Sequence, residues 1–173
     1  MISLIGLPGS GKSTVGRQLA RRLQLPFLDS DRVIEERLGC SIREFFESEG
    51  EQRFRDIEAA VIDELTQQPV GVLSTGGGVV LRPENRQHLH DRTRVIYLNS
   101  MPDELFRRLR HDKNRPLLQV ADPLQRLRDL HAQRHPLYRE TAHFCVETGR
   151  PSVSRLVNLI IMQLEQADLR LRL

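Results

Sequence analysis

The sequence predicts an α/β fold of three layers, α/β/α, in which a five-stranded parallel sheet is covered by helices on both faces. Short β-rich segments alternate with amphipathic helical segments along the chain, a pattern typical of parallel sheets. The first apolar segment runs directly into GLPGSGKST, a glycine-rich junction between a strand and a helix. The 173 residues contain no internal repeat and no linker-like tract, so one domain is the simplest organisation.

The expected strands are the β-rich segments, and the helices fill the spaces between them. Strands are predicted at residues 2–5, 26–29, 70–75, 94–99 and 143–147. Helices are predicted at about residues 12–24, 31–68, 83–91, 102–111 and 123–142, with a last helix from about residue 153. Some boundaries carry local signals, because Ser41 and Glu44 fit a capping box and three prolines occupy expected first turns, namely Pro83, Pro102 and Pro123.

Charge and composition argue against several classes of protein. With 39% hydrophobic and 28% charged residues the chain is ordinary for a globular domain, and no apolar run approaches the ~18 residues of a membrane span. The net charge of +3 arises from arginines dispersed among acidic residues, without a nucleic-acid-binding pattern. Cys40 and Cys145 form no paired-cysteine motif, so we expect reduced thiols and no zinc site. The first strand leaves no room for a signal peptide, so we expect a cytoplasmic protein that binds neither nucleic acid nor membrane.

Residues 6–13 match the phosphate-loop pattern G-x-x-x-x-G-K-[ST] at every position. The glycines at positions 6, 9 and 11 allow positive φ angles and a close approach of the backbone to a ligand. The following helix begins near Lys12, so its free N–H groups and the positive end of its dipole face the same spot. We therefore expect the loop to hold the phosphates of a nucleotide, with Lys12 reaching the β- and γ-phosphates and Ser13 ligating Mg²⁺.

Carboxylates and glycines follow the next two strands. Asp29 and Asp31 come at the end of the second strand, and STGGG, residues 74–78, follows the third. The carboxyl ends of parallel strands meet in one crevice, so we expect these residues beside the phosphate loop. There one carboxylate can hold the hydration shell of a metal ion, while the other orients and deprotonates an acceptor hydroxyl. Two structural interpretations stay open, since Ser30 or Asp31 could cap the next helix and the glycines could form a flexible turn.

Two further segments admit both a functional and a structural interpretation. HDKNRPLLQVADP and the preceding Arg110 lack periodicity and contribute Lys113 and Arg115, which suits either a lid over phosphates or a basic surface loop. EGEQRFRDIE carries Arg55 within a predicted helix, where an i, i+3 pair with Glu58 explains the arginine without any ligand.

The ordered set GLPGSGKSTVG, FLDSD, EGEQRFRDIE, LSTGGG, DKNRPLL and RHPLYRETA resembles the shikimate kinases of aromatic amino-acid biosynthesis, over nearly the whole chain. The resemblance implies a P-loop kinase fold similar to that of nucleoside-monophosphate kinases, with a substrate-binding section near residues 31–60 and a lid near residues 110–122. It also implies a monomer that transfers the γ-phosphoryl group of ATP to the 3-hydroxyl of shikimate, with one Mg²⁺ ion as cofactor.

The resemblance further implies roles for individual residues. Asp29 would hold the metal through water, Ser13 would ligate it, and Asp31 would contact and activate the shikimate hydroxyl. The residues expected to be catalytic are Lys12, Asp31 and Arg115. Those expected to bind ATP are Gly9, Ser10, Gly11, Lys12, Ser13, Thr14, Arg108, Arg110, Arg115 and Arg150, with the arginine that packs the adenine left open. Those expected to bind shikimate are Asp31, Arg55, Gly76, Gly77, Gly78 and Arg134, with the two arginines gripping its carboxylate.

One feature departs from general P-loop practice, and two other functions fit parts of the sequence. The third predicted strand ends in Ser74 and Thr75, where other P-loop enzymes carry a metal-binding aspartate, so Asp29 would have to serve instead.

A kinase of another hydroxy acid, such as gluconate, would share the phosphate loop but would not explain FRDIE and TGGG together. A binding or regulatory module that has lost turnover is disfavoured, because Lys12 and Asp31 are both intact.

Overall fold

The computed structural model of the chain describes residues 1–112 and 119–171. Its centre is a parallel sheet of five strands in the order β2-β3-β1-β4-β5. The strands are β1 (Ile2–Ile5), β2 (Phe27–Asp29), β3 (Val72–Ser74), β4 (Arg94–Asn99) and β5 (Phe144–Glu147). The predicted five-stranded parallel sheet is therefore confirmed, and each strand end lies within two residues of its prediction.

The described residues form eight α-helices and one short 3-10 helix. They are α1 (Lys12–Leu23), α2 (Ser30–Leu38), α3 (Ile42–Glu49), α4 (Glu51–Leu65), η1 (Val79–Leu81), α5 (Pro83–Arg92), α6 (Pro102–Leu109), α7 (Pro123–Thr141) and α8 (Val153–Leu171). The segment predicted as helical between residues 31 and 68 divides into α2, α3 and α4, and η1 was not predicted. In the described parts of the chain, no helix is both long and apolar enough to cross a membrane.

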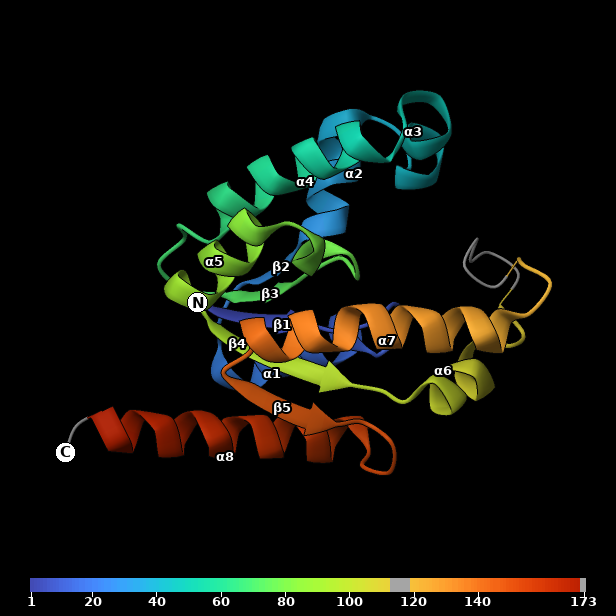
Figure 1. The fold of residues 1–173 in the computed structure, drawn as a ribbon. Coiled ribbons are helices and arrows are strands. Elements are labelled where there is room, and N and C mark those ends of the chain that lie inside the picture. The colour runs from blue at the N-terminus through green and yellow to red at the C-terminus, as the bar shows by residue number, and fades with distance from the viewer. Residues whose placement is uncertain (113–118, 172–173) are drawn as a thin grey trace.

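Helices cover both faces of the sheet (Figure 1). On one face, Leu4 of β1 packs in a core with Leu19 of α1 and Val157 of α8. On the other face, Ile5 of β1 packs in a second core with residues of α4, α5 and α7, among them Leu89. Successive side chains of a strand point to opposite faces, so the central strand contributes to both cores and the predicted three layers are confirmed.

Local signals fix several helix ends as predicted. Ser41 is the N-cap of α3, and its hydroxyl accepts a hydrogen bond from the N–H of Glu44 at 3.1 Å. The prolines predicted at first turns begin α5, α6 and α7. These residues favour helix initiation because an N-cap side chain satisfies a free N–H and proline lacks one.

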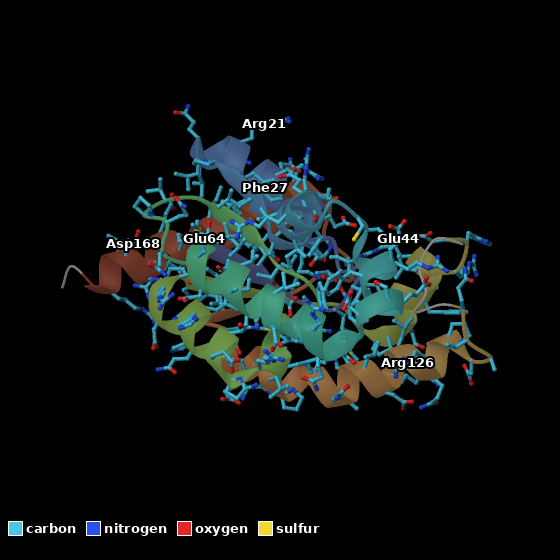
Figure 2. The ribbon with its side chains drawn as sticks, turned by 90° about the horizontal axis from the view of Figure 1, so that it is seen from above. Arg21, Phe27, Glu44, Glu64, Arg126 and Asp168 are labelled. Atoms are coloured by element: carbon cyan, nitrogen blue, oxygen red, sulfur yellow. The ribbon has the colours of Figure 1, made fainter. Side chains whose placement is uncertain are left out.

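The sheet directs three loops to one edge of the molecule. Its carboxyl edge faces α3, α6 and the first turns of α7, while both chain ends lie toward the opposite side (Figure 1). Seen from above, Glu44 and Arg126 lie at one end of the molecule and Asp168 lies at the other (Figure 2). From the central β1 the chain passes to β2 on one side, and it later crosses to β4 on the other side. Such a change of direction leaves a crevice at the carboxyl ends of the strands, where ligands bind.

Candidate active site

The segment between β1 and α1 has the conformation that the glycine pattern predicts. Gly6, Gly9 and Gly11 have φ angles of 154°, 83° and 93°. A Cβ atom at Gly6 would lie 2.6 Å from the carbonyl oxygen of Leu98, so both the backbone conformation and the available space require glycine there. Because α1 begins at Lys12, its free N–H groups open onto the loop.

Lys12 reaches back over the loop. Its Nζ donates to the carbonyl oxygens of Gly6 at 2.8 Å and Leu7 at 2.9 Å, and it lies 3.5 Å from the hydroxyl of Ser10. The residue is only 8% exposed, yet it lines a cavity at the carboxyl edge of the sheet. These oxygens hold the ammonium at the loop, where a phosphate group would meet a fixed positive charge.

The cavity at this edge has a volume of about 410 Å³. The loops that follow β1, β2 and β3 all contribute to its wall, as expected for a parallel sheet. Its lining residues are Pro8, Gly9, Gly11, Lys12, Ser13, Thr14, Asp29, Asp31, Thr75, Gly77, Arg108 and Leu109.

Three oxygen-bearing side chains meet at the start of α1. The Ser13 hydroxyl donates to Oδ2 of Asp29 at 2.9 Å, and it lies 3.4 Å from the hydroxyl of Ser74. In the sheet, Asp29 and Ser74 are neighbours in register on β2 and β3. Hydroxyl and carboxylate oxygens are the ligand type that Mg²⁺ prefers, so the donor set fits this ion.

Asp29 also caps α2, so the structural alternative that Ser30 or Asp31 caps this helix does not hold. The backbone of Asp29 is extended, with φ −122° and ψ 116°, and the helix begins at the next residue. Oδ1 of Asp29 accepts hydrogen bonds from the N–H groups of Asp31 at 3.1 Å and Arg32 at 3.3 Å. One carboxylate therefore fixes the start of α2 with one oxygen and contacts Ser13 with the other.

Asp31 stands among negative charges. Its carboxylate lies so close to the glycine segment that a Cβ at Gly76 would be 2.7 Å from Oδ1 of Asp31 and 3.1 Å from Oε2 of Glu58. Burial, with the charges of Glu58 and Asp29, raises the pKa of the Asp31 carboxyl to about 6, and Lys12 only partly opposes this rise. A carboxyl with such a pKa is a suitable proton acceptor near neutral pH.

Arg55 and Glu58 form the predicted i, i+3 pair on α4, with Nη1 of Arg55 donating to Oε1 of Glu58 at 2.8 Å. Their side chains are only 12% and 1% exposed. Burial raises the pKa of Glu58, and the positive charges of Arg55 and Arg134 counteract it. Oε2 of Glu58 is buried without a hydrogen-bond partner in the described residues. The pair is therefore a buried contact beside Asp31 and the glycine segment, not an exposed pair on the surface of the helix.

The glycines after β3 lack side chains, which allows neighbouring groups to pack directly against their backbone. A Cβ at Gly78 would overlap with the guanidinium of Arg55, and one at Gly77 would lie 2.6 Å from the ring of Pro8. Neither position tolerates a larger residue without displacing a neighbour. The glycine segment thus packs closely between the phosphate loop and α4, and it is more constrained than a flexible turn.

Helix α7 supplies another arginine to the same region. The positive charge of Arg134 lowers the pKa values of both Glu58 and Tyr138, so its guanidinium lies near both groups. Nε of Arg134 is buried and has no hydrogen-bond partner in the described part of the chain. The structure therefore gathers Asp31, Arg55 and Arg134 from α2, α4 and α7 around the glycines.

The arginines expected at the adenine lie in different places. Arg108 lines the cavity, and its Nη1 donates to the carbonyl oxygen of Gly9 at 2.8 Å. Arg110 follows α6 and is not among the lining residues, whereas Arg150 lines a different pocket with Pro151. Arg115 and Lys113 lie outside the described residues, as does the part of the expected lid from residue 113 to residue 118.

Sequence reasoning missed two residues of the site, Glu58 and Tyr138. Glu58 had been interpreted only as the partner of Arg55, because the pairing distance along a helix is visible in a sequence whereas burial is not. Tyr138 lies within the RHPLYRETA segment, one helical turn after Arg134, which was the only available signal.

Three features of this site together define a class of protein. The phosphate loop holds a buried lysine, a serine and an aspartate beside it suit a metal ion, and an acidic side chain lies between the loop and two arginines. They are the parts of a P-loop kinase that phosphorylates a small anionic molecule. The fold and the cavity agree with this class.

Comparisons with known proteins identify the family. The family model described as shikimate kinase matches residues 8–165. A shikimate kinase of Paracidovorax citrulli is 62% identical over 98% of this chain and 94% of its own length. The shikimate kinase of Ralstonia nicotianae is 57% identical over 97% of this chain and 88% of its own length. A solved shikimate kinase from Acinetobacter baumannii in complex with shikimate is 45% identical, covers 96% of this chain and 93% of its own, and superposes with a TM-score of 0.91.

The chain belongs to the shikimate kinase family. It is an ATP-dependent kinase that phosphorylates shikimate.

We predict that Asp31→Asn stabilises the nucleotide-free protein at pH 8. The folded pKa of about 6 lies above the usual 3.8, so the folded state binds the proton more tightly and loses stability as the pH rises from about 4 to 6. Above that range the ionised side chain costs on the order of 1 to 3 kcal/mol, which asparagine avoids. Urea unfolding should therefore show a gain at pH 8 that becomes small at pH 4.

Asp129→Asn, on the exposed face of α7, serves as the control and should show no such pH-dependent gain. If Asp31→Asn is no more stable than the unmodified protein at pH 8, the ionised carboxylate of Asp31 does not destabilise the folded state as the structure indicates.

Proposed function

We propose that this site transfers the γ-phosphoryl group of ATP to the 3-hydroxyl of shikimate, with Asp31 as the general base. The observation that carries the proposal is the place of Asp31, whose carboxylate borders both the phosphate-loop cavity and the group formed by Gly76 and Glu58. The relative from Acinetobacter baumannii, which was solved with shikimate, supports this acceptor. A base at that position can take the proton of a hydroxyl as it attacks a phosphate held by the loop.

On the nucleotide side, the loop N–H groups and Lys12 bind the phosphates and stabilise the charge that grows on the transferred group. Arg108 supports the same side, because it lines the cavity and bonds to the loop at Gly9. We also propose ATP contacts for the loop residues Ser10, Gly11 and Thr14. Roles for Arg110, Arg115 and Arg150, and a lid over residues 110–122, stay predictions.

A Mg²⁺ ion fits the oxygens of Ser13 and Asp29, which lie 2.9 Å apart beside the loop. When bound with ATP, it would neutralise phosphate charge and favour departure of ADP. Asp29 is well suited to this task, since its other oxygen is fixed by two backbone N–H groups of α2. Ser13, at the second position of α1, brings its hydroxyl to the same place.

On the acceptor side, Arg55 and Arg134 bind the shikimate carboxylate. The Arg55 side chain is only 12% exposed, and Nε of Arg134 is buried without a hydrogen-bond partner among the residues that the structure describes. A substrate carboxylate could accept hydrogen bonds from both guanidinium groups. Glu58 holds Arg55 in place through its 2.8 Å bond, and the absence of side chains at residues 76–78 lets Asp31 and Arg55 lie close to the backbone there. The substrate-binding section near residues 31–60 covers α2, α3 and most of α4. A cytoplasmic, monomeric state without nucleic-acid partners stays a prediction.

Turnover should depend on shikimate and on Asp31. In a coupled assay of ADP release, shikimate should stimulate turnover and gluconate should not. Asp31→Asn should lower kcat by about 100-fold or more while calorimetry still detects MgATP binding. Because Asp31 must be ionised to accept a proton, kcat/KM for shikimate at saturating MgATP should fall as the pH drops through about 6.

The base assignment fails if Asp31→Asn retains near-normal kcat. The proposed acceptor fails if shikimate does not raise ADP release above background, whatever the variants do.

Arg134→Ala should raise the KM for shikimate about tenfold or more and leave the KM for ATP unchanged, because a charged hydrogen bond to the acceptor is lost. Arg128→Ala is the matched control on the same helix, where Arg128 pairs at the surface with Asp103 at 3.3 Å. Steady-state kinetics with each substrate varied in turn measure both constants. An unchanged shikimate KM in Arg134→Ala would remove the carboxylate role of this arginine.

Gly78→Ala should raise the KM for shikimate by about tenfold, since its Cβ would overlap with the guanidinium of Arg55 and displace it. Gly149→Ala is the control, because the nearest atom to its Cβ would be at an ordinary 3.6 Å. Equal values of the shikimate KM in the two variants would show that shikimate binding does not depend on the present position of Arg55.

A further inference from the structure

The side chain of Tyr138 lies at the contact between α7 and the glycine segment after β3. Tyr138 is fully buried, and its hydroxyl donates a hydrogen bond to the carbonyl oxygen of Gly77. Burial raises the pKa of this hydroxyl to about 12, so it carries its proton throughout the physiological range and remains a donor. The bond therefore attaches the glycine segment to a helix that is far away in sequence.

The hydrogen bond to the carbonyl of Gly77 also orients the N–H of Gly78. The two groups belong to one planar peptide unit, and no peptide bond in the described residues is cis. In a trans unit the carbonyl and the N–H point in opposite directions, so the hydroxyl of Tyr138 directs the N–H of Gly78 away from α7. Gly77 itself lines the cavity and packs against Pro8 of the phosphate loop.

The same tyrosine lies beside the cation of α7. Arg134 precedes Tyr138 by one helical turn, so both side chains lie on one face of the helix. The charge of Arg134 lowers the pKa of the tyrosine hydroxyl against the effect of burial, which indicates their proximity. Tyr138 thus borders two groups that come from different elements and meet at the acceptor side.

We propose that Tyr138 is a positioning residue for the acceptor, which fixes the peptide of Gly77 and Gly78 relative to Arg134 so that both meet one shikimate molecule. This inference rests on the acceptor site proposed above. It assigns to Tyr138 no contact with substrate and no proton transfer. Loss of its hydroxyl should therefore weaken the binding of shikimate and leave the nucleotide side unchanged.

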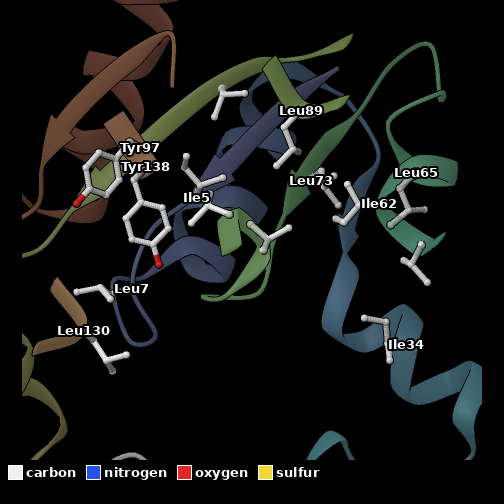
Figure 3. Close-up of a cluster of buried hydrophobic side chains, with 14 of the residues drawn as sticks. Ile5, Leu7, Ile34, Ile62, Leu65, Leu73, Leu89, Tyr97, Leu130 and Tyr138 are labelled. Carbon is white, nitrogen blue, oxygen red and sulfur yellow. The ribbon is translucent and has the colours of Figure 1, made fainter. Parts of the chain in front are cut away.

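The chain provides a matched control, because it has two tyrosines. The ring of Tyr97 lies with its centroid 4.9 Å from that of Tyr138 and is equally buried, at 1% exposure. Its hydroxyl donates to Oδ1 of Asn99 at 3.0 Å and lies 2.8 Å from Nδ1 of His135, and neither group belongs to the glycine segment. Figure 3 shows the two rings side by side with their hydroxyl oxygens pointing to different places.

The first experiment compares Tyr138→Phe with Tyr97→Phe. Tyr138→Phe should raise the KM for shikimate about 5- to 20-fold, the range expected for one lost hydrogen bond, with the KM for ATP within about twofold of the unmodified protein. Tyr97→Phe should change neither constant by more than about twofold. A shikimate KM for Tyr138→Phe equal to that of Tyr97→Phe, or an equal rise in both constants, would overturn the inference.

A second measurement uses the unmodified protein and does not need the variant to fold. With ¹³C at the ζ carbon of tyrosine, the spectrum should contain two signals, which Tyr97→Phe assigns. Saturating shikimate should shift the signal of Tyr138 and leave that of Tyr97 in place, and an unmoved Tyr138 signal would contradict the proposal. Arg134→Ala distinguishes failure of the acceptor site from failure of the role of Tyr138. An unaltered shikimate KM in Arg134→Ala rejects the acceptor site itself. A raised shikimate KM in Arg134→Ala, together with no effect of Tyr138→Phe and no shift of the Tyr138 signal, rejects only the role of the tyrosine.

Discussion

The site depends on two carboxyl groups, those of Asp31 and Glu58, that lie close together in a largely buried position. Asp31 and Glu58 approach the same glycine, and burial raises the pKa of each. Positive charges oppose this rise, from Lys12 at Asp31 and from Arg55, Arg134 and Arg82 at Glu58. Burial first, and then the negative charges of Glu58 and Asp29, raise the pKa of the Asp31 carboxyl, so the cost in stability and the capacity to accept a proton have the same causes.

Two of these cations, Lys12 and Arg55, act at fixed places because each is held by its own set of hydrogen bonds. Loop carbonyl oxygens hold Lys12, and the buried carboxylate of Glu58 holds Arg55. Arg55 also lies over the ring of Phe54, with its guanidinium carbon 5.1 Å from the ring centroid. The glycines after β3 allow these groups to approach, since any Cβ there would strike Asp31, Pro8 or Arg55. Preorganised charges of this kind do not need to rearrange during the reaction, which is the main source of electrostatic catalysis.

The sequence predicted the parts of this structure that follow from local rules. The alternation of segments predicted the parallel sheet, and the sheet in turn placed Asp29 and Asp31 beside the phosphate loop. Local rules failed where tertiary packing decided the outcome. Glu58 is buried although its spacing from Arg55 fits an exposed pair equally well. The cap of α2 differs from expectation for a local reason, because the helix begins at Ser30, one residue earlier than predicted, and Asp29 accepts the hydrogen bonds of its first N–H groups. The bond from Tyr138 to Gly77 joins residues 61 positions apart, and no periodicity in a single sequence reports such a contact.

The serine at the end of β3 explains how the carboxylate proposed to bind the metal can come from the neighbouring strand. Ser74 is the register neighbour of Asp29 in the sheet, and its short side chain leaves Oδ2 of Asp29 free to reach Ser13 at 2.9 Å. An aspartate at residue 74 would bring a second negative charge against Asp29 in an already acidic space. Moving the carboxylate to β2 has a further consequence, because Asp29 then caps α2 through the N–H of Asp31. The residue suited to the metal and the residue suited to proton transfer are thus joined by one hydrogen bond, and the geometry of either constrains the other.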